Sequence, residues 1–166
     1  MGSLRDERRA AVYAAEQQLR DLLERAAQFG SVDFFGSNLL LPVERRFDSL
    51  EQVAAYFGDV LAASAWSAVR APKLRERRGA AAAHYEFERA CIALPVTGGE
   101  WAWRETVLLH ELAHHIVGET SADAAAHGSE FVGVFVALIE QQLGESAALI
   151  LRAAFDGVGV EVGRLQ

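Results

Sequence analysis

The sequence contains few of the residues that stabilise small exported domains. Cysteine occurs once, as Cys91, so no intramolecular disulfide can form and a cysteine-rich zinc ribbon is excluded. Cys91 lies in the apolar segment "ACIALP", where we expect a buried thiol and not a metal ligand. Because a lone cysteine is typical of a reducing compartment, we expect a cytoplasmic protein.

Long apolar runs are absent as well. No uninterrupted run reaches the roughly 18 residues that a membrane-spanning helix needs, and "MGSLRDERRA" lacks the apolar core of a secretory signal. We therefore expect no membrane partner. The composition, 51% hydrophobic and 23% charged, is typical of a globular protein. A chain of 166 residues suits one domain, residues 1–166.

Excess positive charge is also missing, because the net charge is −7. Nucleic-acid affinity depends on clustered Lys and Arg, so we expect this chain to bind nucleic acid poorly. The exception is "RAPKLRERR", residues 70–78. A solvated hairpin is the favoured interpretation of this segment, and a surface for an anionic partner is the alternative.

The first half of the chain predicts helices and strands in alternation. Gly30 is expected to end the first helix, Asp48 or Ser49 to cap the second, and Gly79 to turn the chain between two strands. Pro42 weakens the first strand. The predicted elements are an amphipathic helix over 4–28, a strand over 38–47, a helix over 49–64, and strands at about 67–72 and 84–95.

The second half is predicted to be helical. Thr97 and Glu100 have the spacing of a capping box, so a helix should begin near Gly98 and end at Gly118. Residues 128–144 are apolar almost all round and predict a buried helix, and Ser146 should cap a last one.

Together these elements predict an α+β fold. An N-terminal helix and a small, mostly antiparallel sheet of three or slightly more strands would pack on the helix that begins near residue 98. Two C-terminal helices would follow.

The segment "HELAH", His110 to His114, has the H-E-x-x-H pattern. On a helix the two histidines lie about 40° apart on one face and can reach one metal ion. Glu111 lies about 100° from His110, beside the pair, where a carboxylate can act as a general base. The alternative is that these histidines have only a structural role. The metal interpretation is favoured because the helix that carries them is predicted independently, by its cap and its apolar arc. The apolar residues fall on the remaining arc: Leu108, Leu109, Leu112, Ala113, Ile116 and Val117.

A catalytic zinc ion takes three protein ligands and a water. His127, thirteen residues after His114, is the favoured third ligand for one Zn²⁺ ion. The competing candidates are Glu119, Asp123 and Glu130.

Several polar residues are candidates for supporting roles. His115 lies about 100° from His114 around the helix and cannot bind the same ion, so we expect it to support or pack against the site. Glu130 can accept a hydrogen bond from a ligand imidazole. The candidates for stabilising an oxyanion are His84, Tyr85, Arg104 and His115, and the sequence does not choose among them.

"HELAHH" followed by "HGSEF" resembles the SprT-like zincins, which include the Spartan proteases. This resemblance covers about residues 110–131 and applies to His110, Glu111, His114 and His127. Four longer segments resemble a family of small actinobacterial metallohydrolases: "RDERRAAVYAAE", "IALP", "WAWRETVLLHELAHH" and "HGSEFVGVFVALI". The resemblance implies a minimal zincin fold and a zinc-dependent hydrolase, most simply a peptidase, with no known substrate.

The function predicted from the sequence is therefore zinc-dependent peptide hydrolysis with Glu111 as general base. An extended peptide or protein substrate would pair with the strand at about 86–95 by edge addition. The alternatives are a non-catalytic zinc domain that binds a partner, and a hydrolase of a non-peptide amide. A DNA-associated protease acting through residues 70–78 is the weakest interpretation, because the zinc ribbon and a basic tail are both missing.

Overall fold

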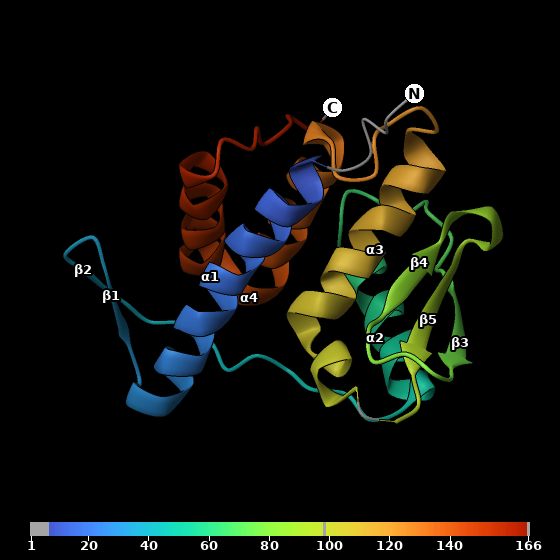
Figure 1. The fold of residues 1–166 in the computed structure, drawn as a ribbon, viewed down its shortest axis with the longest axis horizontal. Coiled ribbons are helices and arrows are strands. Elements are labelled where there is room, and N and C mark those ends of the chain that lie inside the picture. The colour runs from blue at the N-terminus through green and yellow to red at the C-terminus, as the bar shows by residue number, and fades with distance from the viewer. Residues whose placement is uncertain (1–6, 98, 166) are drawn as a thin grey trace. The chain divides into compact units, whose positions relative to one another are not determined.

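The computed structural model describes residues 7–97 and 99–165. Its contacts divide the chain into two compact units. The first unit comprises the segments up to Val43 and from Ala124 onward, and the second runs from Glu44 to Asp123. Helices, small sheets and two C-terminal helical segments give the α+β layout that the sequence predicts (Figure 1). The single domain over 1–166 stays a prediction.

In the first unit, helix α1 (Glu7–Phe29) packs against helix α4 (Ser129–Gly157). The helix predicted over 4–28 is confirmed from residue 7 onward, and residues 4–6 lie outside the described part. Gly30 follows α1 with φ 87, the left-handed conformation that ends a helix. The packed face of α1 is one apolar stripe at helical spacing: Val12, Ala15, Leu19, Leu23 and Ala26.

A short hairpin follows α1. Strands β1 (Val32–Phe34) and β2 (Ser37–Leu39) pair antiparallel. Phe35 and Gly36 connect them with φ of 49 and 81, as a two-residue turn with two positive φ angles requires. The strand predicted over 38–47 ends at Leu39, and among residues 40–47 the structure gives a single bridge, Arg46 antiparallel to Arg104. Pro42 lacks the N–H that a continuous ladder needs.

Helix α4 is broken at Gly144, where φ is 86 and ψ is 172. Arg152 Nη2 nevertheless donates to Glu140 Oε2 at 3.1 Å. Twelve residues span about 18 Å in a straight helix, too far for these side chains to meet, so the chain folds back at Gly144. This break separates the two C-terminal helices that the sequence predicts.

By length and composition alone, α4 is long and apolar enough to cross a membrane. The sequence predicted no such segment. However, 56% of the apolar 18-residue stretch within α4 is buried inside the structure, as in the core helix of a globular protein. The break at Gly144 also leaves two pieces that each fall short of the roughly 18 residues a span needs.

The second unit contains helix α2 (Leu50–Ala62) and a three-stranded sheet. Ser49 caps α2 by accepting a hydrogen bond from Gln52 N at 3.2 Å, as predicted. The strands are β3 (Lys73–Arg77), β4 (His84–Glu86) and β5 (Cys91–Pro95), in the order β3-β5-β4. β5 runs parallel to β3 and antiparallel to β4. Every residue of β5 is buried, Cys91 included, so the predicted buried thiol is confirmed.

Three predictions about this sheet are wrong. The strand expected at 67–72 forms at 73–77. The strand expected over 84–95 is interrupted by a 3₁₀ turn, η1 (Phe87–Arg89), and by Ala90 in the left-handed conformation. β5 is the central strand of the sheet, between β3 and β4. The peptide-binding edge expected at 86–95 is therefore wrong for β5, and β4 is the edge strand on that side.

The basic segment 70–78 supplies the other edge strand, β3. Arg75 forms an ion pair with Glu86 across the sheet, so one positive charge of the segment 70–78 is neutralised within the protein. The solvated hairpin favoured for this segment does not form, because β3 pairs parallel with β5 and not with the next strand, β4. The ion pair also leaves less positive charge for an anionic partner.

Helix α3 (Glu105–Thr120) begins later than predicted. A short 3₁₀ helix, η2 (Glu100–Trp103), comes first, and Arg104 is extended. The predicted start near Gly98 lies outside the described residues, and no side chain at the start of α3 acts as its N-cap. Gly118 does not end the helix. It lies inside α3, where an added Cβ would be 3.3 Å from Tyr85 Oη.

Candidate metal centre

The start of α3 is fixed by a carboxylate from far upstream in the sequence. Arg104 Nε and Nη2 donate to Glu44 Oε2 at 2.9 and 2.6 Å, and Thr106 N donates to Glu44 Oε1 at 2.9 Å. Glu44 thus binds a free N–H of the first helical turn, as an N-cap residue would. Arg104, a predicted oxyanion candidate, is 3% exposed and is engaged by this ion pair.

The next residue, Glu105, is buried in a second polar network. Tyr56 Oη donates to Glu105 Oε1 at 2.6 Å, and Arg45 N donates to Glu105 Oε2 at 2.9 Å. Burial, and then the charge of Glu105, raise the pKa of Tyr56 above its ordinary value. These contacts fix the position of the first turn of α3, just before the histidines begin.

His110 and His114 lie one turn apart on α3 and are 2% and 6% exposed. Their Nε2 atoms are 3.1 Å apart. Two nitrogens bound to one tetrahedral zinc ion at about 2.0–2.1 Å would be about 3.3 Å apart. The pair therefore already has nearly the separation that one ion requires. Glu111, between them in the sequence, is 5% exposed.

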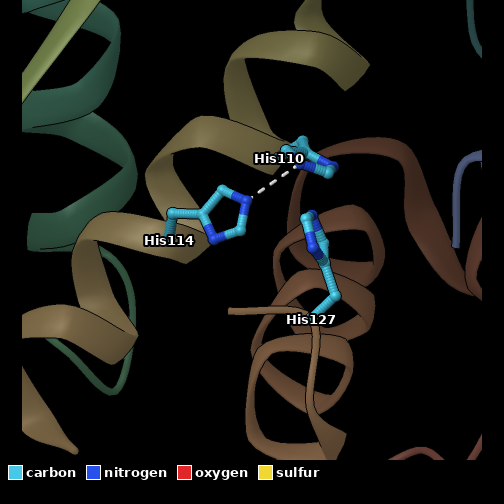
Figure 2. Close-up of side chains that lie close together, drawn as sticks. All are labelled: His110, His114 and His127. Carbon is cyan, nitrogen blue, oxygen red and sulfur yellow. Dashed lines mark hydrogen bonds between the residues drawn. The ribbon is translucent and has the colours of Figure 1, made fainter. Parts of the chain in front are cut away.

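His127 completes a group of three possible ligands (Figure 2). His110, His114 and His127 each offer one ring nitrogen, and these atoms all lie within 4.8 Å of one another. The group fits a metal ion in chemistry as well, because buried imidazole nitrogens suit zinc and related divalent ions.

The ring of His127 is held by aromatic neighbours of its own unit. The Tyr13 ring of α1 lies 5.9 Å from it and the Phe131 ring of α4 lies 5.1 Å from it, measured between centroids. The competing acids of the sequence analysis are all exposed, and within the described residues none joins the group: Glu119, Asp123 and Glu130.

His115 points away from this group, as its helical position predicts. It is 1% exposed, its Nε2 lies 2.6 Å from Arg70 O, and its Nδ1 lies 3.2 Å from Tyr85 Oη. Tyr85 is also buried, on β4, and burial followed by the charge of Glu119 raises the pKa of Tyr85 to about 12. The hydroxyl therefore keeps its proton at neutral pH.

Two other candidates lie at the surface. Glu130 accepts a hydrogen bond from Ser129 Oγ at 3.2 Å, so its carboxylate is engaged at the start of α4. Its predicted hydrogen bond to a ligand imidazole stays a prediction. His84 is exposed on β4.

Two residues that contact α3 were not predicted from the sequence: Glu44, which binds its first turn, and Phe87, which packs against His114. Nothing in the pattern around Glu44 indicates a partner 60 residues away. The Phe87 ring lies 5.7 Å from that of His114, and its place within the strand predicted over 84–95 was the only signal available.

Comparisons with protein-family models, curated proteins and solved structures found no match for this chain. The resemblance to SprT-like zincins and to small actinobacterial metallohydrolases stays a prediction.

Proposed function

We propose that this protein is a zinc-dependent metallopeptidase in which His110, His114 and His127 hold the ion. The observation that carries the proposal is the convergence of three buried imidazoles within 4.8 Å, with Glu111 next to His110 on the same helix. A zinc ion bound there would supply Lewis acidity and lower the pKa of a water towards 7.

Glu111 is the proposed general base. Its carboxylate takes a proton from the attacking water and passes it to the amine that leaves when the peptide bond breaks. Within the described residues Glu111 is not one of the three grouped ligands, so in this proposal it acts on the water and not as a ligand.

A catalytic role is favoured over a purely structural zinc site by the ligand count. Structural zinc sites are closed by four protein ligands, whereas catalytic sites use three and keep one position open. Within the described residues the group contains three histidines and no carboxylate or thiol.

An extended peptide is the proposed substrate. β4 is an edge strand that pairs only with β5 in the described part of the chain, and an exposed edge can bind a peptide through main-chain hydrogen bonds. A surface pocket of about 510 Å³ lies along β4 and η1, and its lining includes Tyr85 and Phe87. Both rings pack against His114, which links this surface to the metal ligands.

The test compares wild-type protein with Glu111→Gln in a proteome-derived peptide library and by metal analysis. The variant should keep its zinc and its folding and lose cleavage by about 10²–10⁴-fold. Glu51→Gln, an exposed change of the same kind on α2, is the matched control and should cleave normally. Equal cleavage by Glu111→Gln would rule out the proposed base.

The third ligand needs a separate test. His127→Ala should lower zinc content sharply, because two imidazoles hold the ion much less tightly than three. His84→Ala, which changes an exposed histidine, should keep full zinc content. Stoichiometric zinc in His127→Ala with unchanged affinity would show that another residue is the third ligand.

A further inference from the structure

We propose that Tyr85 is a positioning residue that fixes the imidazole of His114, and that His115 anchors Tyr85 for this purpose. The inference rests on the proposed metal function. It gives a defined role to Tyr85, which the sequence offered only as a candidate for oxyanion stabilisation, and to His115, for which the sequence predicted a supporting or packing role.

The first step is the hydrogen bonding of His115. Its Nε2 is 2.6 Å from the carbonyl oxygen of Arg70, and because a carbonyl oxygen only accepts, Nε2 carries the proton. In the neutral imidazole Nδ1 is then the acceptor, so Tyr85 Oη donates to it at 3.2 Å. The Tyr85 proton is thus committed to His115 and is not directed at a substrate.

The second step is the ring of Tyr85. It lies parallel to the ring of His114, with an interplanar angle of 7° and a centroid separation of 6.4 Å. The Phe87 ring meets the same imidazole at 67° and 5.7 Å, and also packs edge-on against Tyr85 at 4.8 Å. Two aromatic rings therefore restrict the rotation of His114 about its side-chain bonds.

The third step is the space that α3 leaves for Tyr85. Gly118, one turn after His114, lies where an added Cβ would be 3.3 Å from Tyr85 Oη and 3.6 Å from Tyr85 Cε1. Glycine inside a helix lowers stability relative to alanine. This cost is explained if the close approach of Tyr85 to α3 is needed.

Together these contacts pre-organise one metal ligand. A histidine that is already held in its ligating rotamer loses less conformational entropy when an ion binds. Residues that orient metal ligands typically change metal affinity by 10–100-fold when they are substituted. The effect should therefore appear in metal affinity and ligand geometry, and not only in turnover.

The test uses Co²⁺ as a spectroscopic probe added to the metal-free protein. Tyr85→Leu removes the ring and should raise the Kd for Co²⁺ about tenfold or more and alter the visible absorption bands of the bound ion. Tyr85→Phe keeps the ring and should retain the wild-type bands, with a Kd within about threefold. The difference in Kd between wild type and Tyr85→Phe measures how much the hydrogen bond from Tyr85 to His115 contributes to metal affinity.

Phe57→Leu is the matched control, because Phe57 is a buried aromatic residue of the same unit, 1% exposed, whose ring packs on Tyr56 of the same helix, α2. It should lower thermal stability without altering the cobalt bands. Wild-type affinity and bands in Tyr85→Leu would overturn the proposal, and so would equal changes in Tyr85→Leu and Tyr85→Phe.

A second measurement separates this inference from the proposed function. If the wild-type protein bound no Co²⁺, the proposed function would fail, but the packing of His114 can still be read in the metal-free protein by NMR. Ring currents should shift the His114 imidazole proton resonances in wild type and in Tyr85→Phe, and Tyr85→Leu should lose that shift. Unchanged resonances in Tyr85→Leu would refute the positioning role.

Discussion

Helices α3 and α4 are both mostly buried, yet they bury different kinds of residue. Apolar residues and a glycine make up the buried positions of α4. α3 also buries five ionisable side chains within eleven positions: Glu105, His110, Glu111, His114 and His115. Burying polar groups lowers stability unless each is compensated by a partner.

The difference separates a helix that stabilises the fold from one that carries chemistry. On α3 the structure assigns protein partners to Glu105 and His115, and it groups His110 and His114 with His127. Ionisable groups retained at such a cost are typical of functional sites. Substitutions in the two helices should therefore affect different properties of the protein.

The largest effect on stability is expected in α4. Phe135→Ala removes a ring that is 0% exposed and should lower the free energy of unfolding by about 3–5 kcal/mol, because a cavity remains in a well-packed core. Urea denaturation measures this change. Leu149→Ala, also on α4 but with Leu149 53% exposed, should change stability by less than about 0.5 kcal/mol. Similar losses in the two variants would contradict the assigned packing of α4.

An intermediate effect is expected where a partner of α3 is removed. Tyr56→Phe deletes the hydroxyl that donates to Glu105 and should lower the free energy of unfolding by about 1–3 kcal/mol, since a buried carboxylate loses a hydrogen bond. A loss below the error of the measurement would show that Glu105 is compensated in another way.

The same hydroxyl predicts a dependence of stability on alkaline pH. Because the pKa of Tyr56 is raised in the folded protein, its stabilising contribution is fully present below the ordinary tyrosine pKa of about 10. Above that pH the unfolded chain releases the proton first, so stability should fall by up to about 1.4 kcal/mol per pH unit. Tyr56→Phe should show a shallower fall between pH 10 and 11, measured by urea denaturation.

The smallest effect on stability is expected for a ligand of the proposed metal site. His110→Leu should change the free energy of unfolding of the metal-free protein by less than about 1 kcal/mol, because burying an apolar side chain in place of a polar one offsets the hydrogen bond that His114 loses. It should also abolish stoichiometric zinc binding. A loss above about 2 kcal/mol in the metal-free protein would indicate that His110 has a structural role instead.

Local patterns predicted those parts of the site that a single helix determines. The arc from Leu108 to Val117 is buried as its spacing predicts, and His110 and His114 face one another. A helix has a fixed rotation per residue, so the neighbours of a residue on one helix follow from the sequence alone.

Features set by distant residues could not be predicted. The capping box at Thr97 and Glu100 has the right spacing, but α3 begins at Glu105, where Glu44 binds its first turn. The strand predicted over 84–95 breaks at Ala90, which adopts a left-handed conformation that alanine rarely favours. β4 and β5 on either side of this break pair with each other, and β5 also pairs with β3. Such pairing depends on distant residues, so the local sequence does not predict the break.

The contact between Glu44 and Thr106 also bears on the order of folding. It joins residues 62 positions apart, and closing so long a loop loses chain entropy before any contact compensates for it. The segment 105–120, at 16 residues, is near the length at which isolated helices are marginal in water. An excised peptide of this sequence should therefore be largely unstructured, because it lacks the Glu44 carboxylate that binds its first turn.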